Sequence, residues 1–153
     1  MALKPTRVTV PGGDSVASFM TEVAERGSVV IWGPTATGSL GGLDDPNSSV
    51  RLPTNSGGVP VGILMNDVVN KDLTRLHLNQ HKDEVQVNGK VAILKQGTIQ
   101  TNMIFPGISP VAGSGAYYTT SGLLTTSVVS TALVGKFASA KDADGYVVVD
   151  VRL

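Results

Sequence analysis

The spacing of apolar and polar residues along this chain predicts short β-strands separated by turns. Apolar residues form short runs or alternate with polar ones, and Gly, Pro, Ser, Asn or Asp follows each stretch. Short strands at roughly ten-residue intervals are typical of sandwiches and barrels. We therefore expect a mainly β domain, built as a small antiparallel β-barrel or meander. The strands and hairpins are predicted at residues 28–32, 61–65, 85–94, 98–101, 115–126 and 134–153.

Turn sequences give the most specific local predictions. Asn88–Gly89 lies between alternating apolar residues and is the preferred sequence of a type I′ hairpin turn. Such a turn places Gly89 at positive φ, so Gly89→Val is expected to destabilise the domain. Residues 95–97 predict a second turn, and Ser121–Gly122 and Asp144–Gly145 predict the turns of the two C-terminal hairpins.

The N-terminal residues 1–13 are predicted to form an extended arm in front of a single domain at residues 14–153. Pro5, Pro11 and the Gly12–Gly13 pair flank a short segment that cannot be helical across its prolines. Deletion of residues 1–13 is therefore expected to leave the domain folded.

A short amphipathic helix is predicted over residues 15–26. Asp14 or Ser15 can cap this helix, and Gly27 can end it. A helix this short is marginal alone, so its apolar stripe must dock either on its own domain or on a neighbouring subunit. The apolar residues at helical spacing are Val16, Phe19, Met20, Val23 and Ala24.

A long polar loop is predicted over residues 33–60, because Gly, Pro, Ser, Asn and Asp dominate there without periodicity. Loops of this length in compact domains are usually functional or mobile. Beyond it, alternation over residues 74–79 favours another strand.

Composition excludes several classes of function. Twelve basic and twelve acidic residues cancel, so no global field draws the protein to nucleic acid or an anionic membrane. No cysteine is present, which removes disulfides and thiol chemistry. No apolar run approaches the ~20 residues of a membrane helix. We expect neither a nucleic-acid partner nor a membrane partner.

Candidate chemistry is sparse. His77 and His81 are four residues apart and would share one face of a helix, but no third metal ligand follows in a known pattern. Asp142 and Asp144 fit a tight turn better than a calcium loop. Residues 33–42 are glycine-rich but lack the Gly-Lys-Ser/Thr ending of a phosphate loop. The sequence predicts no catalytic residue, no cofactor and no metal.

Three segments, residues 91–101, 115–126 and 134–151, resemble the capsid decoration, or cement, proteins of tailed bacteriophages. The resemblance covers roughly residues 60–153. It implies the β-tulip fold of the lambda-type head decoration family. It also implies that the chain forms a homo-oligomer, a trimer by preference. It also implies an N-terminal arm that adds a strand to the major capsid protein.

The resemblance makes the expected function structural. The chain would be made in the host cytoplasm, bind the outer surface of the capsid and cement neighbouring capsomers, and thereby stabilise the expanded head. Deleting the arm should then weaken attachment to capsids. The expected capsid-binding residues are Lys4, Pro5, Thr6, Arg7, Val8, Thr9 and Val10. The expected oligomer or docking contacts are Phe19, Met20, Val23, Trp32, Tyr117 and Tyr118, of which the adjacent tyrosines must face opposite sides of a strand.

Two alternatives stay open. One is another virion structural role, in a tail tube, a head–tail joint or a fibre. The other is a carbohydrate- or host-surface-binding module, in which Trp32 or the exposed member of the Tyr117–Tyr118 pair stacks on a ligand beside residues 33–60. An enzyme with a metal at His77 and His81 is a more distant third.

Overall fold

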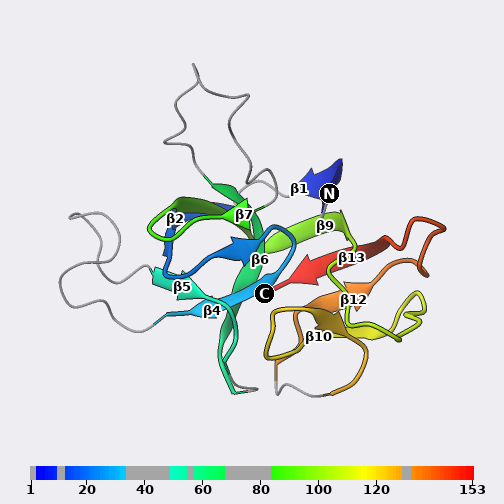
Figure 1. Cartoon of the computed structure of the whole chain (residues 1–153). Helices are drawn as coiled ribbons and strands as arrows, with labels where there is room; N and C mark the ends of the chain where they lie inside the picture. The colour runs from blue at the N-terminus through cyan, green and yellow to red at the C-terminus, as the bar shows by residue number, and fades with distance from the viewer. Residues whose placement is uncertain (1–2, 10–12, 34–48, 55–56, 68–83, 129–131) are drawn as a thin grey trace.

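The chain folds into a five-stranded barrel and a curled six-stranded sheet that packs against it (Figure 1). The computed structural model describes residues 3–9, 13–33, 49–54, 57–67, 84–128 and 132–153. Within these ranges the protein is all-β and contains no helix. The described part of the chain therefore has no helix that is long and apolar enough to cross a membrane.

Five strands form the barrel. They follow the order β2-β5-β4-β6-β8 and close on themselves. β2 and β5 are parallel, whereas the other neighbours are antiparallel. The barrel is therefore mixed, and the prediction of an antiparallel barrel is wrong in this respect. The barrel strands are β2 (Asp14–Met20), β4 (Val29–Trp32), β5 (Ser49–Arg51), β6 (Pro60–Asp67) and β8 (Lys90–Leu94).

The second sheet follows the order β1-β9-β13-β12-β10-β11 and is antiparallel throughout. Figure 1 shows β9, β13, β12 and β10 on one side of the molecule and the barrel on the other. A two-stranded pair, β3 (Ala24–Glu25) with β7 (Glu84–Val85), completes the fold. The sheet strands are β1 (Leu3–Thr9), β9 (Gln96–Thr101), β10 (Gly115–Tyr118), β11 (Leu124–Thr125), β12 (Gly135–Phe137) and β13 (Val147–Arg152).

The chain passes from the barrel into the sheet at Lys95. The N–H groups of Lys95 and Gln96 both donate to the carbonyl of Gly13, at 2.6 and 2.9 Å. The chain bends at Lys95 alone, between β8 and β9, and Gln96 and Gly97 already belong to β9. The turn predicted at residues 95–97 is therefore wrong. Gly97 has a positive φ of 144°, a conformation that favours glycine, and it pairs with Val151 of β13.

Two apolar cores explain why the central strands are apolar on both faces. One core fills the barrel and includes Val30, Leu64 and Ile93. The other lies between barrel and sheet, where Ile31 and Leu94 of the barrel meet residues such as Val149. Strands that are buried on both faces read as continuous apolar runs. The strands predicted at residues 28–32 and 61–65 are confirmed, and burial on both faces explains their continuous apolar sequence.

The predicted helix over residues 15–26 is wrong, because β2 and β3 occupy this part of the chain. The pairing of β2 with β8 shifts register between Ser15 and Ser18, and a bulge of this kind breaks strict alternation. The apolar residues then repeat at intervals that imitate helical spacing. Met20 is nonetheless buried in the barrel, whereas Val23 is 46% exposed.

The loop predicted over residues 33–60 contains a strand that the sequence pattern did not reveal. β5 spans only Ser49–Arg51, yet it closes the barrel by pairing with both β2 and β4. Val50 is fully buried, and its polar neighbour Ser49 is 3% exposed. One buried valine between polar residues gives too short a pattern to stand out. The strand predicted over residues 74–79 lies outside the described residues.

The two C-terminal hairpins are confirmed. β10 pairs with β11 around a turn in which the N–H of Gly122 donates to Thr119, and β12 pairs with β13 around a turn closed by Gly145 and Asp142. Both glycines have positive φ, 76° and 86°. Each turn therefore has the glycine of a type I turn followed by a bulge.

The type I′ hairpin predicted at Asn88–Gly89 is wrong, although a turn is present. The N–H of Gly89 donates to the carbonyl of Gln86 at 3.0 Å, so Asn88 occupies the third position of the turn. Asn88 has φ 61°, and Gly89 is not at positive φ. The strands on either side also separate, because β7 pairs with β3 whereas β8 pairs with β2 and β6.

Candidate functional site

The N-terminal strand forms one border of the six-stranded sheet. β1 pairs with β9 from Leu3↔Thr101 to Thr9↔Gly97, with a register shift between Leu3 and Arg7. No second neighbour of β1 occurs among the described residues, so one of its two hydrogen-bonding edges points away from the sheet. Such an edge can accept an extended strand from another protein.

Residues 3–9 of the predicted arm are thus paired with the sheet. Residues Lys4 to Thr9 lie in β1, and Val10 lies outside the described residues. Residues 10–12 separate β1 from Gly13. The carbonyl of Gly13 accepts hydrogen bonds from the N–H groups of Lys95 and Gln96, where β8 is followed by β9. A truncation that removes the arm must therefore spare Gly13 if the barrel is to keep this contact.

The predicted docking residues divide between core and surface. Met20 and Tyr118 are fully buried, so neither offers surface to a partner. Phe19 is half-buried on β2, and Val23 and Trp32 are 46% and 44% exposed. Met20 and Trp32 both pair with Val50 of β5, so Phe19, Met20 and Trp32 lie on neighbouring barrel strands. Tyr117 and Tyr118 lie apart from them, on β10 of the six-stranded sheet.

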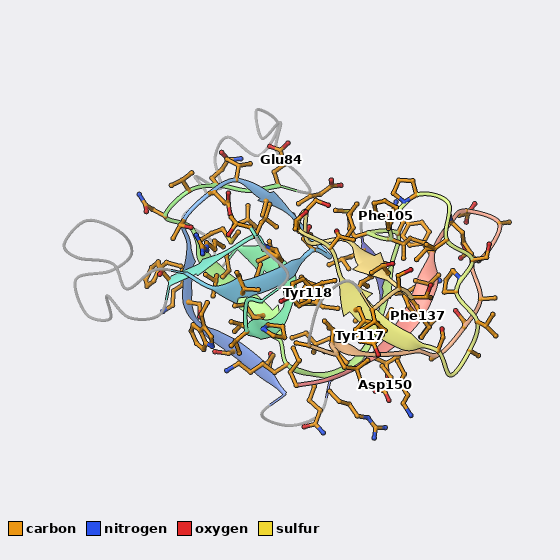
Figure 2. The ribbon with its side chains drawn as sticks, turned by 90° about the horizontal axis from the view of Figure 1, so that it is seen from below. Glu84, Phe105, Tyr117, Tyr118, Phe137 and Asp150 are labelled. Atoms are coloured by element: carbon orange, nitrogen blue, oxygen red, sulfur yellow. The ribbon has the colours of Figure 1, made fainter. Side chains whose placement is uncertain are left out.

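The Tyr117–Tyr118 pair faces opposite sides of β10, as predicted. The Tyr118 hydroxyl donates to the carbonyl of Gly58, and burial raises the pKa of this phenol. Tyr118 therefore ties the sheet to the barrel, and Figure 2 shows it between the two halves. Tyr117 is half-buried and lies over Gly115, where Leu133 also approaches.

Trp32 stands at the end of β4 and is the only tryptophan of the chain. Strand alternation puts it on the face of Val30, which belongs to the barrel core, so the ring lies at one end of the barrel. The backbone N–H of Trp32 donates to the carbonyl of Val59 at 3.4 Å, and Val59 is 65% exposed. An exposed indole beside an exposed valine is an apolar spot suited to stacking or packing.

A second exposed apolar region lies on a long connection that the sequence reasoning missed. Residues 102–114 join β9 to β10, and two turns in this connection have Gly107 and Gly113 at positive φ, 85° and 91°. Phe105 is 46% exposed and Val111 is 66% exposed on these turns. The Pro106–Gly107 pair is a turn signal that could have marked this connection.

The outward face of the sheet is polar. Lys136 lies opposite Asp150 in the β12–β13 register, and the Arg152 guanidinium is 2.9 Å from the Asp150 carboxylate. Figure 2 labels Asp150 and Tyr117 in this half of the molecule. Exposed ion pairs of this kind contribute about 0–1 kcal/mol each. Asp150 thus lies between two cationic side chains on this face, Lys136 on β12 and Arg152 on its own strand.

The described residues hold no group of three or more His, Asp or Glu side chains that could bind a metal. His77 and His81 lie outside the described residues. Asp142 uses Oδ1 to accept from the N–H groups of Asp144 and Tyr146, so this carboxylate caps a turn. No protein-family model and no curated protein sequence matches the chain.

Proposed function

We propose that this chain is a head decoration protein of a tailed bacteriophage. It would bind the outer surface of the capsid, cement neighbouring capsomers and stabilise the expanded head. A β-tulip fold and a homo-oligomer, a trimer by preference, belong to the same proposal. The observation that carries it is the outward edge of β1, because the N-terminal segment for which an arm is expected is an extended border strand.

The rest of the molecule supports this role by its construction. The two apolar cores fill the barrel and the space between barrel and sheet, and they hold these two parts together. A cement protein needs a rigid frame, an edge for strand addition and exposed apolar contacts. Trp32, Val59, Phe105 and Val111 supply exposed apolar side chains on this frame.

The direct test is sedimentation of the protein with purified shells made from the major capsid protein of the same virus, before and after expansion. We expect binding to expanded shells and little binding to unexpanded ones, because the protein stabilises the state that it binds. Electron cryomicroscopy of virions made with and without the chain should show its density on the outer surface. Density in the tail or at the neck would assign the chain to another virion role.

Proline substitutions in β1 test the strand-addition step. Successive N–H groups of an antiparallel strand point to opposite sides, so Val8→Pro and Thr9→Pro remove one inward and one outward donor. The proline that removes the inward donor breaks a bond to β9 and should lower the melting temperature. The proline that removes the outward donor should leave the melting temperature unchanged and weaken shell binding. Val8→Ala and Thr9→Ala control for the side chains. Full shell binding by both proline variants would exclude β1 as the attachment strand.

A carbohydrate- or host-surface-binding module is the second candidate, favoured by the exposed Trp32 ring at the barrel end. Stacking on a sugar would use this indole. A glycan array tests it, with Trp32→Ala as the variant and Phe105→Ala as the control at another exposed aromatic. Binding that only Trp32→Ala abolishes would favour this function over capsid decoration.

A further inference from the structure

Asn88 combines three features that concern its chemistry rather than its packing. It precedes Gly89 in the one Asn-Gly pair of the chain, its side chain is exposed, and its φ is 61°. No other non-glycine residue of the described part has positive φ. An Asn followed by glycine is the pair in which the next backbone nitrogen reaches the side-chain amide with least hindrance, because glycine has no Cβ.

The backbone around Asn88 is held by three hydrogen bonds. The Asn88 N–H donates to the carbonyl of Met20 at 2.8 Å, and the Met20 N–H donates to the carbonyl of Gly89 at 3.0 Å. The Gly89 N–H donates to Gln86 at 3.0 Å. The first two bonds extend the ladder between β2 and β8, and the third occupies the nitrogen that would attack the Asn88 side chain.

We propose that Asn88 is a site of spontaneous deamidation, and that opening of the β2–β8 ladder controls its rate. In the opened turn, Gly89 N loses its proton and forms a bond to Cγ of Asn88, and the side-chain nitrogen leaves as ammonia. Water then opens the resulting succinimide and gives aspartate or isoaspartate. The net reaction consumes one water and releases one ammonia.

The two products have different consequences for the barrel. Aspartate keeps the main chain unchanged, and it tolerates the left-handed conformation that Asn88 adopts. Isoaspartate adds one methylene to the main chain between the Asn88 N–H and the Gly89 carbonyl. Both of these groups pair with Met20, so the isoaspartyl chain cannot re-form both bonds in register.

The rate measurement compares folded and urea-unfolded protein at mildly alkaline pH. Tryptic peptide 83–90 contains Asn88, and mass spectrometry measures its conversion. We expect the folded protein to react at least about tenfold more slowly than the unfolded chain, and urea below the unfolding midpoint to raise the rate progressively. Asn102, which is exposed and precedes Met103, is the internal control and should react slowly in both states.

Equal rates at Asn88 in folded and unfolded protein would overturn the proposal, because the hydrogen bonds would then give no protection. A rate at Asn88 no higher than at Asn102 in the unfolded chain would also overturn it. The products give a second readout. We expect the isolated isoaspartyl form to melt below the Asn88→Asp variant, and identical melting would contradict the assigned role of the Met20 pairing.

Discussion

Gly62 lets β6 and β8 approach more closely than a side chain would permit. A Cβ built on Gly62 would lie 2.3 Å from the carbonyl oxygen of Leu94 and 2.5 Å from a methyl group of Ile93. The obstacle is backbone of the neighbouring strand, which cannot move without disturbing the closed barrel. Sequence alone marks Gly62 only as a glycine inside an apolar run.

We expect Gly62→Ala to lower the free energy of unfolding by about 3 kcal/mol, the upper part of the range for overpacked cores. Gly57→Ala is the matched control, because no heavy atom lies within 4 Å of a Cβ at that position. The control should stay within about 0.5 kcal/mol of the parent. Urea unfolding measures both, and equal effects would show that the β6–β8 spacing adapts.

Tyr118 provides a pH-dependent prediction at the same scale. Its pKa is raised by burial, so the unfolded chain loses this proton at lower pH than the folded protein does. Stability from the neutral phenol is thus complete below the unfolded pKa of about 10 and is lost as pH rises through the folded pKa. We expect the free energy of unfolding to fall above pH ~10.

Tyr118→Phe tests the assignment of that slope. The variant loses the hydrogen bond to the Gly58 carbonyl, which should cost about 1 kcal/mol near neutral pH, and it should lose part of the alkaline slope. Tyr117→Phe is the control on the half-buried neighbour. Urea unfolding at neutral and alkaline pH measures both. An alkaline slope in Tyr118→Phe equal to that of the parent would assign the effect to other groups.

At the scale of elements, the C-terminal hairpins were predictable because their causes are local. Gly122 and Gly145 each end a turn at positive φ, and the flanking strands pair with each other. The two turns differ in their surroundings. A Cβ at Gly122 would lie 2.9 Å from the carbonyl oxygen of Val29 in β4, whereas at Gly145 the nearest atom is 3.6 Å away on the flexible Lys141 side chain.

This difference predicts unequal effects of the same substitution. Gly145→Ala should cost about 1 kcal/mol, the strain of a left-handed alanine. Gly122→Ala should cost more, because it also pushes the turn away from β4, where the Val29 N–H donates to the Gly122 carbonyl at 2.8 Å. Thermal or urea unfolding of both variants decides the matter. Equal losses would mean that the turn does not depend on the barrel.

Elements that depend on distant partners were the ones that sequence reasoning missed. β2 looked helical because its bulge against β8 disturbs alternation, and β5 is too short to show a pattern. The turn at Asn88 is shifted by one residue because Met20 of β2 pairs with both Asn88 and Gly89. The outward edge of β1 could not be predicted either, because its pairing with β9 spans most of the chain.

At the scale of the whole molecule, the barrel strands join the two cores. β4, β6 and β8 each place side chains in the barrel core and in the core beneath the sheet. Leu64 represents the first core and Phe137 the second, and both are at most 1% exposed. Because three strands belong to both cores, damage to one core should be transmitted to the other.

We therefore expect barrel and sheet to unfold in one cooperative transition. Trp32 fluorescence reports on the barrel end, and far-UV circular dichroism reports on all strands, so the two transitions should coincide. Leu64→Ala and Phe137→Ala should each lower the free energy of unfolding by about 3–5 kcal/mol. The decisive variant is Phe137→Ala, whose substitution lies in the sheet while Trp32 lies in the barrel. If the Trp32 transition stayed at the parent's urea concentration while the circular dichroism changed, barrel and sheet would be separate folding units. The rigid frame on which the proposed cement function depends would then be lost.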